Sequence, residues 1–421
     1  MKRKLCYIVM FCSLMLPQWH TSSQALPSCP NDSASVQELY FSSDGQKLNM
    51  FRIDGTFETW DVRTARLEHL YTFASGQVLD ETHSPDGQTI LTGNADKSAY
   101  LWDTQTGKLL HTLPGDDNLV QVVYAPDGKT VLTHSIRWLN LWDTQTGKLM
   151  YSLNVGADAA TYSPDSKTVV VDVSNSRDIE LWDIETGQIL NALKSPTSPS
   201  PIRLYMVYSP DGKTVLINSN DDSNAVWDLR TERVVFNAKV DFATAAYAPD
   251  SKSLLIASRD GSVKVWDIQS GQLLHTLTDQ GQIVERVVYS PNGKIIVTST
   301  GVDFKVWDAQ SGQLLYLLVS HIDTINSIDY ALDDKAILLS GNGATEMWSV
   351  ATGKLLHTFH INFGDNFKPL RVTFSPDKTT MAMWGWASNS VPISLHTPNR
   401  YNPVLIWNAR LGVLLHTLCS S

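Results

Sequence analysis

The chain has 421 residues, of which 43% are hydrophobic and 18% are charged, and its formal net charge is -10. Because an acidic chain repels a phosphate backbone, we expect no nucleic-acid partner. Beyond the first 25 residues no apolar stretch is long enough to cross a bilayer, so we expect no membrane span in the mature chain. The composition is typical of a globular protein that buries a large core.

Residues 1–25 are predicted to be a signal peptide. Three cations precede an almost wholly apolar run at residues 5–16, and small side chains stand at Ser23 and Ala25, where a signal peptidase reads the chain. We therefore expect cleavage after Ala25, an N-terminal segment at 26–35, and a protein that is periplasmic, displayed at the cell surface or secreted. A short membrane anchor that stays uncleaved is the alternative.

The rest of the chain is a repeat whose mark is a tryptophan. Successive marks lie 39 to 45 residues apart, except the last pair, which is 59 apart, and seven of the nine tryptophans are followed by Asp. The nine marks are Trp60, Trp102, Trp142, Trp182, Trp227, Trp266, Trp307, Trp348 and Trp407.

Each unit also carries two turns. The one upstream of the tryptophan has the form Ser84-Pro85-Asp86-Gly87, in which Pro presets φ, Asp bonds the local backbone and Gly permits a positive φ. The one downstream leads into a strand, as in residues 106–113. Runs of about five to seven residues rich in Val, Ile, Leu and Tyr lie between the marks and predict strands. No segment has a convincing helical period.

The Trp-Asp pair, the Ser-Pro-Asp-Gly turn and the Thr-Gly-Lys-Leu-Leu-His-Thr-Leu segment of residues 106–113 resemble the WD-repeat β-propellers. This resemblance covers about residues 36–418. It implies an all-β fold, one closed propeller of four-stranded antiparallel blades in a domain spanning 36–421. Nine units favour nine blades, with an eight-bladed ring as the alternative. The resemblance further implies a non-catalytic, monomeric ring that acts as a protein-binding scaffold.

The sequence departs from the WD pattern in three ways. A Gly-His pair is expected before each blade, but only Ser320-His321 comes close. The Asp is missing after two tryptophans, giving Trp348-Ser349 and Trp407-Asn408. Four aspartates precede their Trp strands, so we expect them to keep part of the family's hydrogen-bond network. They are Asp96, Asp178, Asp260 and Asp303.

Two cysteines remain once the leader is removed, and they bracket the repeats. A closed ring brings its first and last strands together, and export places thiols in an oxidising compartment. We therefore expect a disulfide between Cys29 and Cys419, closing a ring that lacks the shared blade common in propellers. Two free thiols, or lipid attachment at Cys29, are the alternatives.

Three connections are lengthened, near residues 195–201, 360–367 and 386–402. In the family that the chain resembles, these connections share one face, and loops on a rigid scaffold often carry recognition. Residue types that dominate binding hot spots gather in the last two. The candidate binding residues are Phe363, Phe367, Trp386, His396, Arg400 and Tyr401. Packing of the long loops onto the ring is the alternative.

The same face is predicted to carry an acidic rim that could take a basic partner or a divalent cation, or could be solvated turn chemistry. Its members are Asp96, Asp116, Asp117, Asp221, Asp222, Asp260 and Asp279. Four histidines recur on the outer strand and are spaced around the ring, which favours exposed strand residues over a metal site. They are His111, His275, His357 and His416.

The sequence contains no Gly-x-Ser-x-Gly elbow, phosphate loop, His-Glu-x-x-His or Cys-x-x-Cys. We therefore expect no catalytic residue, metal or cofactor. Two other functions stay open. The aromatic loops could bind a carbohydrate or envelope polymer, and carboxylates converging at the channel mouth could form an enzyme site.

Overall fold

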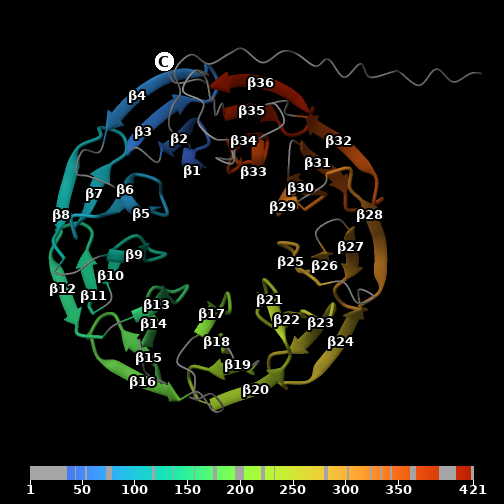
Figure 1. Cartoon of the computed structure of the whole chain (residues 1–421), viewed down its shortest axis with the longest axis horizontal. Coiled ribbons are helices and arrows are strands. Elements are labelled where there is room, and N and C mark those ends of the chain that lie inside the picture. The colour runs from blue at the N-terminus through green and yellow to red at the C-terminus, as the bar shows by residue number, and fades with distance from the viewer. Residues whose placement is uncertain are drawn as a thin grey trace, which may run out of the picture.

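The chain forms a closed ring of nine blades around one axis (Figure 1). Each blade is a four-stranded antiparallel sheet built from four consecutive strands. No helix occurs among the described residues. The all-β propeller predicted from the sequence is therefore confirmed, with nine blades and not eight.

The computed structural model describes residues 36–418 with internal gaps. The residues outside the description are 1–35, 43, 53–54, 73–77, 116–118, 136, 156, 174–177, 195–202, 220–222, 232, 279–282, 301–302, 323–324, 332–333, 342–343, 361–366, 388–403 and 419–421. Among the described residues, no helix has the length and apolar character needed to cross a bilayer.

In each blade the strands follow one another from the ring axis outward. Blades 1 to 3 consist of β1 (Val36–Phe41), β2 (Lys47–Arg52), β3 (Thr56–Asp61), β4 (Arg66–Thr72), β5 (Val78–His83), β6 (Thr89–Asn94), β7 (Ala99–Asp103), β8 (Leu109–Leu113), β9 (Leu119–Tyr124), β10 (Thr130–Ser135), β11 (Leu139–Asp143) and β12 (Leu149–Leu153). Blades 4 to 6 consist of β13 (Ala157–Tyr162), β14 (Thr168–Val173), β15 (Asp178–Asp183), β16 (Ile189–Lys194), β17 (Arg203–Tyr208), β18 (Thr214–Ser219), β19 (Ser223–Asp228), β20 (Arg233–Lys239), β21 (Phe242–Tyr247), β22 (Ser253–Ser258), β23 (Ser262–Asp267) and β24 (Leu273–Thr278). Blades 7 to 9 consist of β25 (Arg286–Tyr289), β26 (Ile295–Ser299), β27 (Asp303–Asp308), β28 (Leu314–Val319), β29 (Ile325–Ala331), β30 (Ala336–Gly341), β31 (Ala344–Ser349), β32 (Leu355–His360), β33 (Phe367–Phe374), β34 (Thr380–Ala387), β35 (Val404–Asn408) and β36 (Val413–Leu418).

The position of a strand within its blade decides how it is buried. Neighbouring blades cover both faces of a second strand, and every residue of β10 is buried. An outer strand is covered less, so β4 alternates between exposed and half-buried residues. Ile90 and Trp102 of blade 2, for example, pack against Phe57 of blade 1. The hydrophobic core is thus a series of interfaces between blades, as in other repeat proteins.

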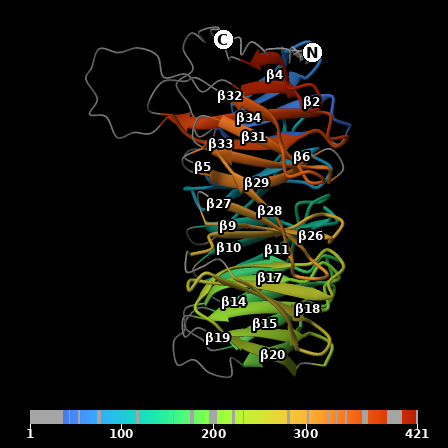
Figure 2. The same ribbon diagram turned by 90° about the vertical axis from the view of Figure 1, so that its right-hand side faces the viewer.

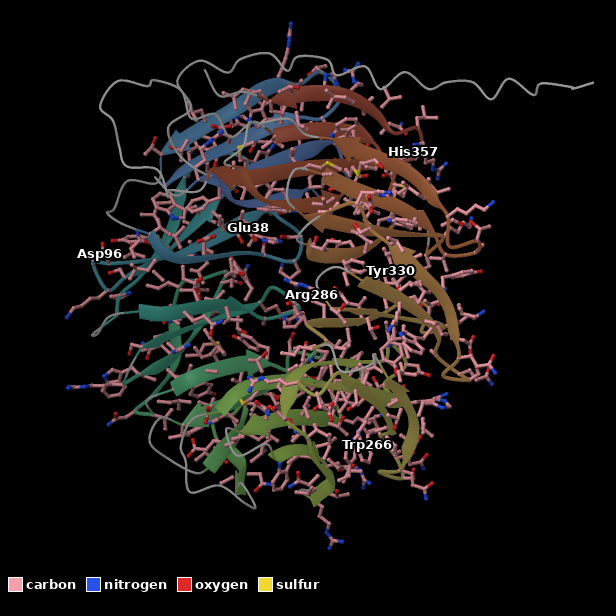
Figure 3. The ribbon with its side chains drawn as sticks, turned by 45° about the vertical axis from the view of Figure 1, so that its right-hand side comes forward. Glu38, Asp96, Trp266, Arg286, Tyr330 and His357 are labelled. Carbon is pink, nitrogen blue, oxygen red and sulfur yellow. The ribbon has the colours of Figure 1, made fainter. Side chains whose placement is uncertain are left out.

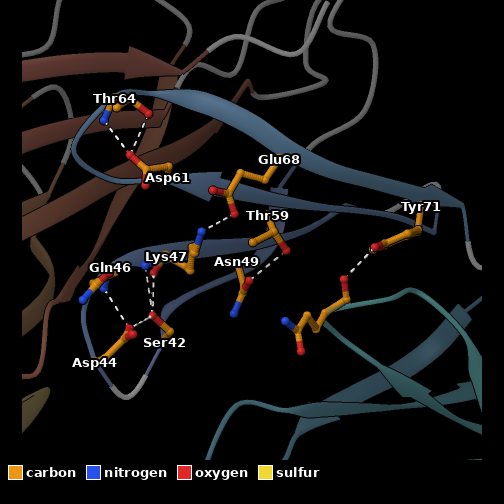
Figure 4. A network of polar contacts seen from close by, with 11 residues as sticks. Ser42, Asp44, Gln46, Lys47, Asn49, Thr59, Asp61, Thr64, Glu68 and Tyr71 are labelled. Atoms are coloured by element: carbon orange, nitrogen blue, oxygen red, sulfur yellow. Dashed lines mark hydrogen bonds and ion pairs between the residues drawn. The ribbon is translucent and has the colours of Figure 1, made fainter.

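The turn that joins the first and second strands is held by its own polar groups (Figure 4). In blade 1, the Ser42 hydroxyl donates to Asp44 Oδ1 at 2.6 Å, and the Gln46 amide donates to the same oxygen at 2.9 Å. Gly45 supplies the positive φ of 71° that closes the turn. These local bonds explain why the sequence motif specifies the hairpin.

The indole N–H of most Trp marks is bound inside its own blade. In three blades it donates to a threonine of the second strand: Trp102 to Thr92, Trp142 to Thr133 and Trp307 to Thr298. In three others it donates to a glutamate two residues earlier: Trp60 to Glu58, Trp182 to Glu180 and Trp348 to Glu346. Of the aspartates expected to keep part of the family's network, Asp96 accepts bonds from the Ser98 amide and the Tyr100 hydroxyl, and Asp260 accepts bonds from the amide and hydroxyl of Ser262. The side chains of Asp178 and Asp303 lie outside the description.

In every blade except blade 4, the outer strand places an aromatic or histidine side chain against the next blade, a contact we call the interblade latch. In six of these blades the side chain forms a hydrogen bond with a backbone carbonyl oxygen in the next blade, in the turn between its third and outer strands. The bonds are Tyr71 to Gln105, His111 to Gln145, Tyr151 to Glu185, His275 to Gln310, Tyr316 to Ala351 and His416 to Arg63. The predicted exposed histidines are therefore contacts between blades, and His357 likewise lies against Gly412.

The ring closes without exchange of a strand between its ends. Val36 and Leu48 of blade 1 share one buried cluster with Trp384 of blade 9. His416 Nε2 lies 3.0 Å from the Arg63 carbonyl oxygen, so the latch also joins the last blade to the first. Cys29 and Cys419 lie outside the described residues, and their disulfide stays a prediction.

Candidate binding face

The antiparallel blades divide their connections between two faces of the ring. The loop face carries the connections between blades and those from second to third strand. The turn face carries the two tight turns of each blade. On the loop face, the connection from second to third strand has two to four residues in eight blades and sixteen, 388–403, in blade 9. The connection between blades is longest at 195–202, with eight residues.

Part of the predicted insertion in blade 9 is strand. β33 and β34 have eight residues each, compared with six in β1 and β2. Phe367 pairs with Ala387 and Lys368 with Trp386, which lengthens the ladder at the loop face. Figure 2 shows this hairpin reaching past the neighbouring blades. The β33–β34 ladder is thus two residues longer than the ladder of β1 and β2.

Two of the six candidate binding residues lie in this hairpin. Phe367 and Trp386 occupy consecutive rungs of the β33–β34 ladder. The other four, Phe363, His396, Arg400 and Tyr401, lie outside the described residues. The sequence therefore predicted where the hairpin insertion lies, while a convergence of all six side chains stays a prediction.

Two of the seven residues predicted to form the acidic rim, Asp96 and Asp260, lie in the part of the chain that the structure describes. Asp96 Oδ1 accepts a bond from the Ser98 amide at 3.0 Å, and its other oxygen accepts one from the Tyr100 hydroxyl at 2.6 Å. Asp260 accepts bonds from the hydroxyl and amide of Ser262, which lower the pKa of the Asp260 carboxyl. Both carboxylates thus stabilise their own loops. The other five members, Asp116, Asp117, Asp221, Asp222 and Asp279, lie outside the description.

Charged residues also lie on the inner strands, where Figure 3 shows Glu38 and Arg286 near the ring axis. Glu38 Oε1 is 2.9 Å from His83 Nδ1, so blades 1 and 2 share an ion pair when His83 is protonated. Asp80 accepts a bond of 2.8 Å from the Val122 amide, and burial raises the pKa of the Asp80 carboxyl. Within the described residues, no group of three His, Cys, Asp or Glu could hold a metal ion.

Sequence reasoning missed these inner residues, although their spacing contains a signal. Glu38, Asp80 and Arg286 each stand four residues before the serine that opens the turn of their blade. The same position therefore faces the same part of the ring in every blade. The acidic members belong to blades 1 and 2, and Arg286 belongs to blade 7.

Ser320-His321 behaves as a remnant of the family's Gly-His pair. The backbone amide and Nδ1 of His321 both lie 3.0 Å from Glu346 Oε1. Glu346 is fully buried, and its other oxygen accepts the Trp348 indole bond at 3.1 Å. A glutamate thus connects the loop face to the tryptophan inside blade 8.

Nine four-stranded blades with a tryptophan on the third strand define a β-propeller of the WD-repeat type. The chain has this architecture and these marks, and a family model described as "WD domain, G-beta repeat" matches residues 67–103 and 238–267. Both matched segments end at a Trp-Asp pair.

Curated relatives match part of the chain. The small ribosomal subunit protein RACK1 of Caenorhabditis elegans is 35% identical over 74 residues, which are 18% of this chain and 23% of that protein. Apoptotic protease-activating factor 1 of Rattus norvegicus is 27% identical over 116 residues, 27% of this chain and 9% of the relative. The alignments thus span less than a quarter of each of these two relatives.

A solved structure shares the fold over a larger part of the chain. The computationally designed Ika8 protein superposes with a TM-score of 0.55 at 20% identity, over 79% of this chain and 98% of the designed one. At this identity the likeness concerns the fold alone.

Proposed function

We propose that the chain is an exported, non-catalytic scaffold that binds a protein partner through its loop face. The observation that carries this proposal is the long hairpin of blade 9. β33 and β34 extend beyond the six residues of β1 and β2, and they lead into a connection of sixteen residues. A stiff ring presents this connection at low cost in ordering entropy, which favours recognition.

The absence of catalysis in this proposal is supported by the contacts of two carboxylates of the inner strands, Glu38 and Asp80. Glu38 lies against His83, and Asp80 accepts the Val122 amide of the next blade. Both groups therefore join neighbouring blades, as expected of structural residues.

Lysine crosslinking tests the proposed face on native material. Lys194 ends β16 at the 195–202 connection, and Lys368 lies in the extended hairpin. We expect partner crosslinks at these two lysines. Lys129 and Lys213 lie in turns of the opposite face and serve as internal controls. Crosslinks to a partner that reach Lys129 and Lys213 but neither Lys194 nor Lys368 would contradict the proposal.

A substitution separates recognition from packing. Trp386→Ala should weaken capture of the crosslinked partner at least tenfold while the melting temperature stays within a few degrees of the unmodified protein. Leu190→Ala, which changes an exposed residue of the outer strand β16, is the matched control. A lower melting temperature with unchanged capture would show that Trp386 packs the hairpin.

Export has its own test. The mature protein, purified from its source, should begin at Leu26 when its N-terminus is sequenced. An N-terminus at Met1 or a lipid-modified Cys29 would contradict the proposed cleavage.

A further inference from the structure

The loss of Asp after two tryptophans changes the charge of one part of the turn face. In blade 2, Asp103 Oδ1 accepts bonds of 2.6 Å from both the amide and the hydroxyl of Thr106. In blade 9, Asn408 Oδ1 takes this place and accepts the amides of Arg410 and Leu411 at 3.0 and 2.9 Å. The turn therefore keeps its shape without a carboxylate.

The change in charge is clear when the nine turns between third and outer strands are compared in groups of three neighbouring blades. We define the basic arc as the turns between third and outer strands in blades 8, 9 and 1, residues 349–354, 408–413 and 61–66. The basic arc has four cations and one acid, Asp61, whereas the corresponding turns of blades 2 to 4 and of blades 5 to 7 each have two cations and four acids. Its cations are Lys354, Arg410, Arg63 and Arg66, all exposed.

The other turns of the same three blades do not cancel this charge. The turns between first and second strands add two lysines and four acids to the arc, which leaves six cations and five acids. Lys47, the first residue of β2, forms an ion pair with Glu68 of the outer strand β4, so this pair adds no net charge. An excess of positive charge therefore remains on the arc of a chain whose net charge is -10.

An exposed apolar group stands in the middle of the arc. Leu411 occupies the turn position that is Thr or Ser in every other blade, and it is 68% exposed. Val413 and Leu415 of β36 continue from it with exposures of 51% and 43%. Folding of the turn does not require a leucine side chain here, because the bond to Asn408 Oδ1 comes from the backbone amide of Leu411.

The charged and apolar groups form one continuous surface. The turn of blade 9 touches blade 8 where Gly412 lies against His357, and His416 touches the blade 1 turn at the Arg63 carbonyl. Exposed Leu355 and Leu356 lie at the start of the blade 8 outer strand. The surface thus runs from β32 through the turn of blade 9 to Arg63.

We propose that the basic arc and Leu411 form a second binding site, for an acidic protein segment that also carries apolar side chains. Its charge complements the four cations, and its apolar groups would cover Leu411 and Val413. The arc lies on the face opposite the long hairpin, so the site is independent of the proposed loop-face partner.

A short acidic segment fits this surface better than an anionic membrane does. The excess of cations is confined to three of the nine blades, while the same turns of the other six have eight acids and four cations. A lipid surface laid on the turn face would meet those acids, within the range of about 8–10 Å over which charges act in physiological salt. A segment that spans three blades avoids them.

Fluorescence anisotropy of a labelled peptide tests the site on the full mature chain. The probe is Glu-Glu-Leu repeated four times, and the same peptide with Lys for Glu is the charge control. We expect the acidic peptide to bind and the basic peptide not to bind, with an affinity that falls as NaCl is raised. Arg410→Glu and Leu411→Ser should each raise the Kd about tenfold.

Arg230→Glu is the matched control, because Arg230 has the same turn position in blade 5 as Arg410 has in blade 9. It should leave the Kd within about twofold. Circular dichroism and melting temperature verify that all three variants are folded. Equal effects of the two Arg variants, or failure of the unmodified chain to bind the acidic peptide, would overturn the proposal. Binding to vesicles of phosphatidylcholine and phosphatidylserine (4:1) without binding to the peptide would also overturn it, in favour of a lipid surface.

Discussion

Gly107 is held to glycine by two separate constraints. Its φ is +64°, a left-handed conformation that side chains with a Cβ rarely adopt. A Cβ placed there would also lie 2.1 Å from the ring of Tyr71, the latch residue of blade 1. Gly128, in a turn between first and second strands, has a similar φ of +73°, but its nearest neighbour, Pro85 Cδ, would be 3.5 Å from an added Cβ.

The two glycines allow the latch to be measured apart from backbone strain. Gly128→Ala should lower the free energy of unfolding by about 1 kcal/mol, through the positive φ. Gly107→Ala should lower it by about 2–4 kcal/mol, because Tyr71 must also move away. Denaturant titration at fixed pH measures both values. Equal losses in the two variants would mean that the Tyr71 contact adds nothing.

At the scale of the strand and turn, tyrosines connect neighbouring blades. A tyrosine at the end of an inner strand contacts a hydroxyl of the preceding blade, in five pairs: Tyr124 with Thr89, Tyr162 with Thr130, Tyr208 with Thr168, Tyr247 with Thr214 and Tyr289 with Ser253. Burial raises the pKa of the Tyr124, Tyr162 and Tyr208 phenols well above the usual value, and it raises the pKa of Tyr289 to about 12. The phenols are therefore stabilised in their neutral form.

This arrangement predicts unfolding in alkali. An unfolded tyrosine titrates near pH 10, so the folded protein binds more protons than the unfolded chain above that pH. The contribution of Tyr289 is fully present below pH 10, and about 2–3 kcal/mol is lost as the pH rises to 12. Absorbance at 295 nm should show the buried tyrosines ionising together with loss of the circular dichroism signal. Tyr289→Phe should delay this transition. Ionisation of all 14 tyrosines near pH 10 in a folded protein would contradict the prediction.

The elements that were predictable from the sequence are those specified by local chemistry. The turn around Asp86 and Gly87 is held by bonds within five residues, so the motif identifies it without tertiary structure. The latch depends on a partner about 35 residues away, as with His275 and Gln310, and the chain pattern alone made the histidine look exposed. Glu38 and Asp80 were missed for the same reason, since only the ring brings inner strands together.

At the scale of the whole molecule, closure of the ring rests on contacts that recur between its other blades. Val36 and Leu418, which begin β1 and end β36, share a buried cluster, and the His416 latch repeats the contact seen at His275. The ring therefore has a non-covalent closure within the described residues. A disulfide between Cys29 and Cys419 would add a constraint on the unfolded chain and would not be needed to form the last interface.

A reductant experiment measures that constraint. Cys419 follows Leu418 directly, and Cys29 lies seven residues before Val36. Val36 and Leu418 share one buried cluster, so a seven-residue segment at about 3.3 Å per residue is long enough to bring Cys29 to Cys419. We expect a Cys29–Cys419 peptide in a non-reducing digest, and a loss of up to about 4–5 kcal/mol in the free energy of unfolding when dithiothreitol is added. Because the His416 latch and the shared cluster remain, the reduced ring should stay folded at 25 °C. Cys419→Ser should show the lower stability with or without reductant. A midpoint that is the same for the unmodified chain in both conditions would rule out the bridge and leave the latch contacts as the closure of the ring.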